Sequence, residues 1–373
     1  MKLCRHHQEC GGCTFQDTPY SEQLSAKKDN LIEITGFEDA VIIESPEIFG
    51  FRNKMEYTFE GESLGLHPRG RFDQVVNLAE CPVFSEWIGD FFENVREFTR
   101  KYEVDFYRRR EKKGVLRYLI CRESKFTGEK MVILVTNGDS FRYEQEWIDM
   151  VSSVLPGAAS IILARRHMIG DTALTDDYSV LSGTETINMR IGSMEMEMSP
   201  YSFFQPNSYL VEKMYNTVRD GIGDGRIMDL FCGVGSITMY IAGKSRRITG
   251  VDSFPSCIKN ARRNVELLNP PGRIDFIEST VRAFLSAVEE PFDYLVMDPP
   301  RGGMSPKVFR HIARIQERFK SIKRIFYICC SLKNLQSDMG LIKEELKWKV
   351  KSVTGIDQFV HTPHLETVVE LEP

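Results

Sequence analysis

The chain of 373 residues lacks any apolar run that approaches the ~18 residues needed to cross a membrane. Its beginning, MKLCRHHQEC, lacks the apolar segment of a secretory signal. It also lacks an excess of positive charge, since its formal net charge is −5. We therefore expect a cytoplasmic protein with no membrane partner. The overall charge gives no reason to expect a nucleic-acid partner, although a local basic face remains compatible with one.

Cysteine is present nine times, and without an export signal these residues favour metal binding or catalysis over a disulfide framework. Cys4, Cys10 and Cys13 gather at the start of the chain, and Cys81 follows at a distance. Four thiolates suit a tetrahedral zinc ion or an iron–sulfur cluster, and the spacing alone does not choose between them. Either group would tie the first segment of the chain to a later one.

The chain divides into three parts. Residues 1–46 hold the cysteine-rich segment and an amphipathic helix with Leu24, Leu31 and Ile32 on its apolar side. Residues 47–200 look mostly β, because short β-branched or aromatic runs end at Gly, Asp or Asn, with one helix among them. We expect this central region to contact the substrate of the third part.

Residues 201–373 alternate apolar runs of strand length with helical stretches. The runs are RIMDLFCG, RITGVD, RIDFIES, FDYLVMDPP and RIFYICC, and WKVKSVTGIDQF and LETVVELE follow as a closing pair of strands. The alternation predicts an α/β, Rossmann-like domain, in which helices cover both faces of a parallel sheet.

Glycines and acids follow these strands where a ligand would bind. Gly233 and Gly235 end the first strand, Asp252 ends the second, and Asp298 opens DPPR after the fourth. Ligands of doubly wound sheets lie at the carboxyl ends of the strands, and an acid there accepts hydrogen bonds from ribose hydroxyls. The third glycine of a dinucleotide site is missing, which favours S-adenosylmethionine over NAD. A tight turn followed by a surface aspartate is the plainer alternative.

The stretch YICCSLKNL places Cys329 and Cys330 at the end of the fifth strand. Adjacent residues of a strand face opposite ways, and Cys330, nearer the edge, is the better nucleophile; both could instead be small core residues. A thiolate has a specific use beside S-adenosylmethionine, because its addition to carbon 6 of a pyrimidine makes carbon 5 nucleophilic. A base must then remove the carbon 5 proton, and Glu366 in HTPHLETVVEL is the candidate.

Five motifs in order, together with the cysteines, resemble the RNA uridine-5-methyltransferases, a family with bacterial and archaeal rRNA and tRNA members. The motifs are FFQPN, DLFCGVGSIT, DPPRGG, YICCSLKNLQSD and HTPHLETVV. The resemblance implies that Cys330 is the nucleophile and Glu366 the base. It implies that Gln205, Phe231 and Asp298 contact the cofactor. It also implies a 4Fe–4S cluster on the four cysteines.

Some positions depart from the family pattern. Asp252 stands where Glu is usual, and Ser236 and Thr280 replace Asn, so hydrogen-bonding ability is kept at all three cofactor positions. Ser331 and Leu332 replace the Asn–Pro that follows the nucleophile. Many relatives carry a small β-barrel RNA-binding domain before the cysteines, whereas this sequence begins at the cysteines. We therefore expect the iron–sulfur and central regions to bind more of the RNA.

Two basic stretches could contact RNA. Residues 108–113 hold five cations, and their composition favours a solvated loop. They would bind phosphate only if this loop lies on the pocket side. Arg52 and Lys54 alternate along a strand and therefore share a face. We expect a monomeric enzyme that methylates carbon 5 of a uridine in tRNA or 23S rRNA. An RNA cytosine-5-methyltransferase and a non-catalytic iron–sulfur RNA-binding protein are the alternatives.

Overall fold

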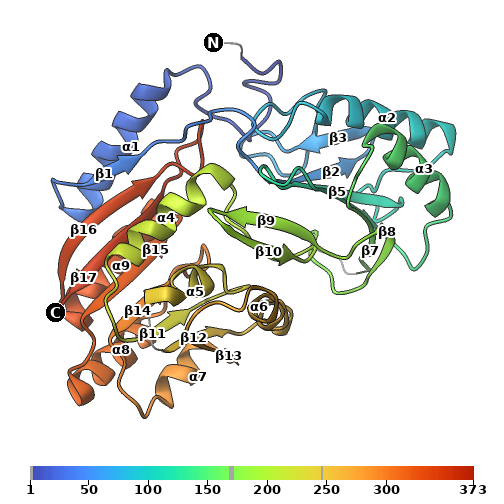
Figure 1. Cartoon of the computed structure of the whole chain (residues 1–373). Coiled ribbons are helices and arrows are strands. Elements are labelled where there is room, and N and C mark those ends of the chain that lie inside the picture. The colour runs from blue at the N-terminus through green and yellow to red at the C-terminus, as the bar shows by residue number, and fades with distance from the viewer. Residues whose placement is uncertain (1–2, 168–171, 245–246) are drawn as a thin grey trace.

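The computed structural model describes residues 3–167, 172–244 and 247–373. In this part of the chain, an eight-stranded sheet, a seven-stranded sheet and a two-stranded hairpin are present. The larger sheet forms the C-terminal half of the molecule, and the hairpin lies between it and the smaller sheet (Figure 1). None of the helices in the described residues has the length and apolar character needed to cross a membrane.

The larger sheet has the order β1-β16-β17-β15-β14-β11-β12-β13. Its central strands, all parallel, are β11 (Arg226–Leu230), β12 (Arg247–Asp252), β13 (Arg273–Glu278), β14 (Tyr294–Met297) and β15 (Arg324–Cys329). The closing pair, β16 (Lys349–Ile356) and β17 (Glu366–Glu372), is antiparallel, and β17 also runs antiparallel to β15. The parallel sheet and the closing pair predicted from the sequence are confirmed.

Helices cover both faces of this sheet. Successive residues of its strands point to opposite sides, and the apolar residues on each side pack against helices. Ile227 of β11 joins one hydrophobic cluster, and its neighbour Met228 joins the other. The helices are α4 (Ser208–Asp220), α5 (Ser236–Tyr240), α6 (Pro255–Leu268), α7 (Val281–Ser286), α8 (Pro306–Phe319) and α9 (Leu332–Leu341), with a 3₁₀ turn at Ala242–Lys244 and a π turn at Ile342–Leu346. Strands buried on both sides explain the continuous apolar runs of the sequence.

The N-terminal helix α1 (Tyr20–Thr35) and strand β1 (Val41–Ile43) pack on the larger sheet, where β1 pairs in parallel with β16. The buried face of α1 differs from the predicted apolar side, since Gln23, Lys27 and Leu31 are buried and Leu24 is only partly so. The Lys27 ammonium lies 2.6 Å from a carboxylate oxygen of Asp357, and both side chains are almost fully buried. The polar face of α1 is therefore buried because Lys27 pairs with an acid 330 residues away in the chain.

The smaller sheet has the order β4-β3-β2-β5-β6-β7-β8, and only β6 and β7 pair in parallel. Its strands are β2 (Lys54–Glu60), β3 (Ser63–Leu66), β4 (Val76–Asn77), β5 (Leu116–Glu123), β6 (Lys130–Thr136), β7 (Ser160–Arg165) and β8 (Tyr178–Gly183). Helices α2 (Ile88–Lys101) and α3 (Glu144–Val154) share a core with one face, to which Met55 and Tyr57 point. Lys54 and Glu56 consequently lie on the other face.

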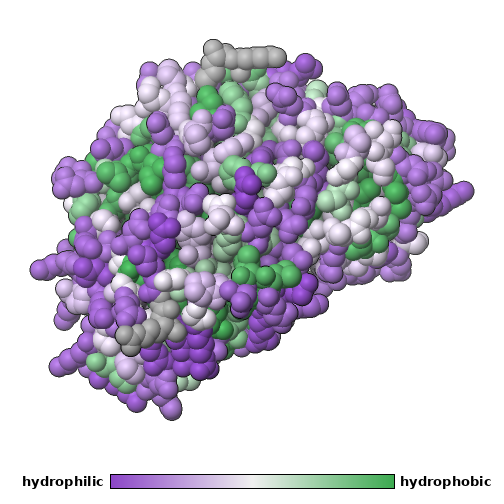
Figure 2. Space-filling view, in the orientation of Figure 1, coloured by the Kyte–Doolittle hydropathy of each residue, from purple (hydrophilic) through white to green (hydrophobic). Residues whose placement is uncertain are grey.

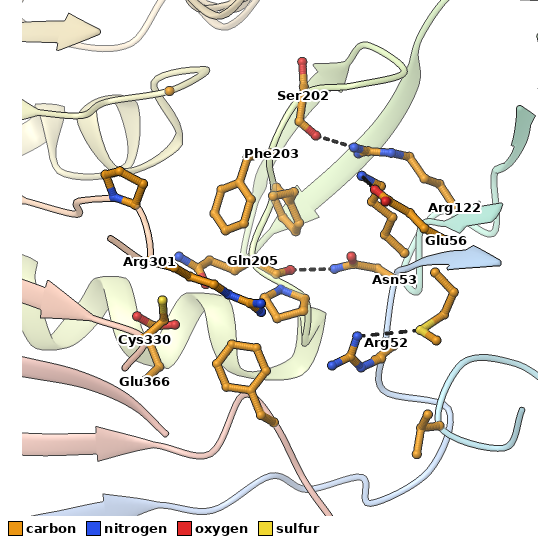
Figure 3. A pocket seen from close by; sticks show the side chains of 18 of the residues that line it. Arg52, Asn53, Glu56, Arg122, Ser202, Phe203, Gln205, Arg301, Cys330 and Glu366 are labelled. Atoms are coloured by element: carbon orange, nitrogen blue, oxygen red, sulfur yellow. Dashed lines mark hydrogen bonds and ion pairs between the residues drawn. The ribbon is translucent and has the colours of Figure 1, made fainter. Parts of the chain in front are cut away.

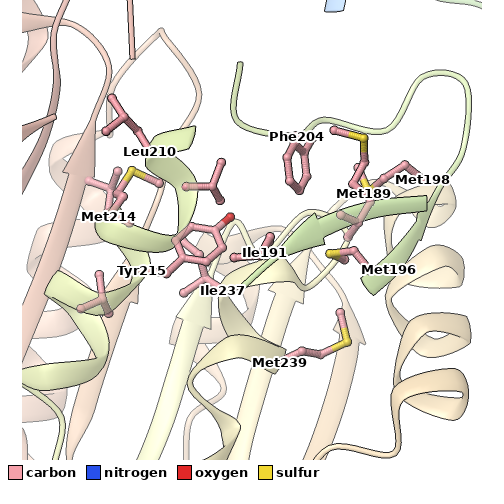
Figure 4. Packing of buried hydrophobic residues seen from close by; sticks show 14 of the residues in the cluster. Met189, Ile191, Met196, Met198, Phe204, Leu210, Met214, Tyr215, Ile237 and Met239 are labelled. Atoms are coloured by element: carbon pink, nitrogen blue, oxygen red, sulfur yellow. The ribbon is translucent and has the colours of Figure 1, made fainter. Parts of the chain in front are cut away.

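The hairpin of β9 (Ile187–Ile191) and β10 (Met194–Met198) joins the two sheets through one hydrophobic cluster. Figure 4 shows Met189 and Met196 of the hairpin on one side of this cluster and Met214 and Tyr215 of α4 on the other, with Phe204 between them. The same cluster includes residues of both sheets, so the two halves share a core. Hydrophilic residues cover much of the face seen in Figure 2, as expected when the apolar clusters are internal.

Candidate functional site

A cavity of about 910 Å³ opens at the carboxyl ends of β11, β12, β14 and β15 and reaches the smaller sheet and the cysteine-rich segment. This edge is where ligands of doubly wound sheets bind. Nearly all of the residues predicted for catalysis, cofactor binding and metal binding line this one cavity; they are Cys4, Cys10, Cys13, Cys81, Gln205, Phe231, Gly233, Ser236, Asp252, Asp298, Cys330 and Glu366.

The turn after β11 is built around unusual backbone angles. Phe231, Gly233 and Gly235 all have positive φ, at 64°, 53° and 78°. A positive φ is uncommon for a bulky residue such as phenylalanine and marks a strained turn of the kind found at binding sites. A side chain at Gly235 would meet the ring of Phe276 at 2.5 Å, so the turn also requires glycine for packing.

Asp252 is held rigidly at the end of β12. One carboxylate oxygen accepts a hydrogen bond of 3.0 Å from the Gly233 amide, and the other accepts one of 2.9 Å from the Phe254 amide. These bonds fix the carboxylate against the glycine turn, where a ribose would lie in this fold. Phe254, which is 65% exposed, lines the same part of the cavity.

Two further residues of this region were missed in the sequence. The Tyr215 hydroxyl lies 2.7 Å from the Ser236 hydroxyl, so α4 contributes to the site. Asp229 is buried and accepts a hydrogen bond from the Thr238 hydroxyl, and burial raises the pKa of its carboxyl to about 7. Asp229 lies inside the apolar run MDLF. An acid within a buried strand is the sequence signal that could have identified it as a site residue.

The two adjacent cysteines face different ways. Cys329 is 4% exposed, belongs to a hydrophobic cluster, and its thiol donates to the carbonyl of Ser331 at 3.3 Å. Cys330 lines the cavity instead. Burial raises the pKa of the Cys330 thiol to about 12, the Glu366 carboxylate raises it as well, and Arg301 opposes both.

Glu366 is the first residue of β17, and it is 2% exposed. Burial raises the pKa of its carboxyl well above the usual range, Asp298 adds to this, and Arg301 lowers it. One of its oxygens has no hydrogen-bond partner among the described residues. Figure 3 shows Glu366 beside Cys330, with Arg301 and Gln205 near them. Arg301 is a site residue that the sequence indicated only through the motif DPPR.

Asp298 and Gln205 connect the catalytic region to both sheets. The Gln205 amide donates to the Asp298 carboxylate at 3.2 Å, and burial raises the pKa of Asp298 to about 7. The backbone carbonyl of Gln205 accepts a hydrogen bond of 2.7 Å from Asn53, just before β2. The segment FFQPN thus spans the cavity between the two halves of the molecule.

Thr280 is separate from this assembly. It is exposed, it caps the N-terminus of α7 by accepting a hydrogen bond of 3.3 Å from the Ala283 amide, and it is not among the residues that line the cavity. Residues 108–113 do not line the cavity either. There, Arg110 lies 3.2 Å from the Asp73 carboxylate, and Arg108 lies 3.6 Å from Glu111.

The four N-terminal and central cysteines line the same cavity, and Cys4, Cys10 and Cys81 all act electrostatically on Cys13. Backbone amides of His6 and Gly12 donate to the sulfur atoms of Cys4 and Cys10, each at 3.4 Å. Within residues 3–167, 172–244 and 247–373, no three or more His, Cys, Asp or Glu side chains form a group that could hold a metal ion.

Comparison with known proteins identifies the family. A model described as tRNA (Uracil-5-)-methyltransferase matches residues 172–373. An uncharacterized RNA methyltransferase of Caldanaerobacter subterraneus is 32% identical over 99% of this chain and 84% of its own. The tRNA (uracil(54)-C(5))-methyltransferase of Pyrococcus horikoshii is 31% identical over 99% of this chain and 85% of its own.

A solved structure agrees with these matches in fold. The tRNA (uracil-54, C5)-methyltransferase of Pyrococcus abyssi, crystallised with S-adenosyl-L-homocysteine, aligns with a TM-score of 0.83 and 29% identity over all of this chain and 87% of its own. The expected resemblance is therefore confirmed. The chain belongs to the tRNA (uracil-5-)-methyltransferase family and is an S-adenosylmethionine-dependent RNA uracil-C5 methyltransferase.

Proposed function

We propose that the enzyme methylates carbon 5 of a uridine in structured RNA through a covalent adduct with Cys330, and that Glu366 is the base that resolves the adduct. The observation that carries this proposal is the convergence of Cys330 and Glu366 in a cavity that also holds the glycine turn and Asp252. A nucleophile, a base and a cofactor site then meet at one place.

S-adenosylmethionine supplies an electrophilic methyl group bound to a positively charged sulfur. In the proposed reaction, the Cys330 thiolate forms a bond to carbon 6 of the uracil, and the electron pair of the 5,6 double bond becomes available at carbon 5. Carbon 5 takes the methyl group and still holds its proton. Glu366 removes that proton, the double bond forms again, and the bond between carbon 6 and the Cys330 sulfur breaks.

The environment of Glu366 suits this role. Burial and the neighbouring Asp298 raise the pKa of its carboxyl, which makes the ionised form a stronger base than an exposed glutamate. Arg301 favours the ionised forms of both Cys330 and Glu366. Six residues that line the cavity are assigned as cofactor contacts, namely Gln205, Phe231, Gly233, Ser236, Asp252 and Asp298. Thr280 remains a prediction from the family pattern.

We propose tRNA as the substrate, because the family description and the Pyrococcus relatives name tRNA. The alternative is 23S rRNA. Purified enzyme, labelled S-adenosylmethionine, and unmodified transcripts of tRNA and 23S rRNA distinguish the two when the products are mapped by mass spectrometry. Methyluridine in tRNA alone supports the assignment, and methyluridine in rRNA alone overturns it. Methylcytidine in either RNA would show that the enzyme acts on cytidine and not on uridine.

We further propose that Cys4, Cys10, Cys13 and Cys81 hold a 4Fe–4S cluster. Four thiols that line one cavity match its ligand number, and backbone amides donate hydrogen bonds to two of the sulfur atoms. Because the four side chains do not form a metal-binding group in the described residues, the cluster would have to draw its ligands together. The charge of Arg52 lowers the pKa values of Cys13 and Cys81, so it favours their thiolates, although burial keeps both values raised overall. The cluster would join residues 4–13 to the segment before α2, which is a structural role.

A further inference from the structure

Two cations lie directly opposite each other in the smaller sheet. Lys54 of β2 and Arg122 of β5 are paired residues of the antiparallel ladder, so their side chains share a face. Like charges in this arrangement destabilise a sheet. Both side chains line the cavity, the Lys54 side chain is only 25% exposed and Arg122 is 3% exposed. A pair this unfavourable calls for an anionic partner.

The protein supplies only part of that partner. Glu56 lies 2.5 Å from the Lys54 ammonium and is the acid that favours the charged form of Arg122. Arg122 also donates a hydrogen bond to the carbonyl of Ser202, yet its Nε has no hydrogen-bond partner among the described residues. Burial lowers the pKa of Arg122 to about 10, and burial followed by the charge of Arg122 lowers the pKa of Lys54. One carboxylate thus serves two cations.

An exposed aromatic ring stands next to this pair. Phe203 is 63% exposed although it lines the cavity, and it follows directly after Ser202, which holds Arg122. In Figure 3, Phe203 projects between the side of the cavity with Cys330 and the side with Arg122 and Glu56. Exposed aromatic rings beside cations are the usual platform for an unstacked base and its phosphate.

We propose that Lys54, Arg122 and Phe203 form a subsite for the nucleotide next to the target uridine, with the two cations on its backbone phosphate and Phe203 stacked on its base. This inference rests on the proposed function. A uridine whose carbon 6 meets Cys330 must leave its stack, and its neighbour then passes the wall of the same cavity. A free phosphate would satisfy the cations, but it would leave Phe203 in water.

The subsite lies at a different place from the basic stretch of residues 108–113, which the sequence also suggested as an RNA contact. Residues 108–113 lie outside the cavity, whereas the subsite lies inside it. Lys113 is exposed and offers a matched control, because Lys113→Met removes the same charge as Lys54→Met.

The test measures RNA binding without S-adenosylmethionine, so it does not depend on turnover. The probe is a synthetic tRNA T-arm hairpin with ordinary uridine at the target position, made in versions that each carry one uncharged methylphosphonate linkage near that position. Lys54→Met should weaken binding about tenfold and lower the salt slope by about one. Phe203→Ala should weaken binding about tenfold or more, from lost stacking. Lys113→Met should change neither value.

One methylphosphonate next to the target should weaken binding by wild-type protein and have little further effect on Lys54→Met, which identifies the phosphate. Equal losses in wild-type protein and Lys54→Met at every linkage would overturn the subsite, as would wild-type affinity of Phe203→Ala. Because Phe203 is exposed, Phe203→Ala tests the proposal even if Lys54→Met, at a less exposed position, does not fold. Adduct formation with wild-type protein is measured separately, and its failure would count against the proposed function and not against the subsite.

Discussion

Cys329 and Thr367 lie opposite each other in the antiparallel ladder between β15 and β17, and the Thr367 hydroxyl donates a hydrogen bond of 2.9 Å to the Cys329 carbonyl. In such a ladder, the residue after one partner is opposite the residue before the other. This register therefore brings Cys330 and Glu366 together at the edge of the sheet. A slip of β15 by one residue would turn its side chains to the opposite face and place Cys329 at the cavity instead.

Glu366→Gln should separate the late step from the early ones. The amide keeps the size of the side chain and removes the basic oxygen, so methyl transfer should proceed and release should stall. Turnover should fall by about 10²–10⁴, and a methylated protein–RNA adduct should accumulate with unmodified RNA on a denaturing gel. Near wild-type turnover would mean that Glu366 is not the base. Loss of both methyl transfer and adduct would place its role before methyl transfer.

Adduct formation should accelerate with pH. Burial and then the Glu366 carboxylate raise the pKa of Cys330 to about 12, so the thiol is mostly protonated near neutral pH and the reactive thiolate increases as pH rises. The rate with 5-fluorouridine RNA should grow by up to about tenfold per pH unit between about pH 6 and pH 9. Arg301→Met should slow it at each pH, because Arg301 favours the thiolate. A rate independent of pH would contradict this account.

Lys27→Met should destabilise the fold strongly. The substitution leaves the Asp357 carboxylate, which is 0% exposed, without its ion-pair partner. Leaving such a charge unpaired costs about 3–5 kcal/mol in the free energy of unfolding, measured by urea denaturation. Lys28→Met, at an exposed position of the same helix, should change it by no more than about 0.5 kcal/mol. Removing both charges, with Asp357→Leu added, should recover part of the loss.

The cysteine site should hold iron and sulfide. Protein purified without oxygen is expected to be brown and to contain about four iron atoms and four acid-labile sulfides per chain. Cys81→Ser should lose the cluster and loosen the N-terminal segment while S-adenosylmethionine binding persists. Cys257→Ser, which alters a cavity cysteine beside the cofactor site, should keep the iron. One zinc ion per chain without sulfide would exclude the cluster.

The C-terminal sheet and its cavity could be predicted because their signals are local. Five apolar runs end at or beside glycine, an acid or cysteine, and parallel strands bring such ends to one edge. The same reasoning placed Cys330, and not Cys329, in the cavity, since neighbours on a strand alternate. These features depend on short stretches of sequence and on rules that hold for any parallel sheet.

Features that depend on distant partners could not be predicted. The buried face of α1 is polar because Lys27 meets Asp357, and Gln23 accepts a hydrogen bond from the His361 amide. Lys54 was recognised as sharing a face with Arg52, but its pairing with Arg122 requires the register of β2 and β5. A strand sequence shows which residues share a face, and it does not show which strand lies beside it.

The most direct test of the central claim uses RNA with 5-fluorouridine at the target position, together with S-adenosylmethionine. Fluorine leaves no proton for Glu366 to remove, so the adduct is trapped after methyl transfer. The account predicts a stable protein–RNA complex with wild-type protein and with Cys329→Ala, and none with Cys330→Ala. A complex that persists in Cys330→Ala, or one that is lost only in Cys329→Ala, would contradict it.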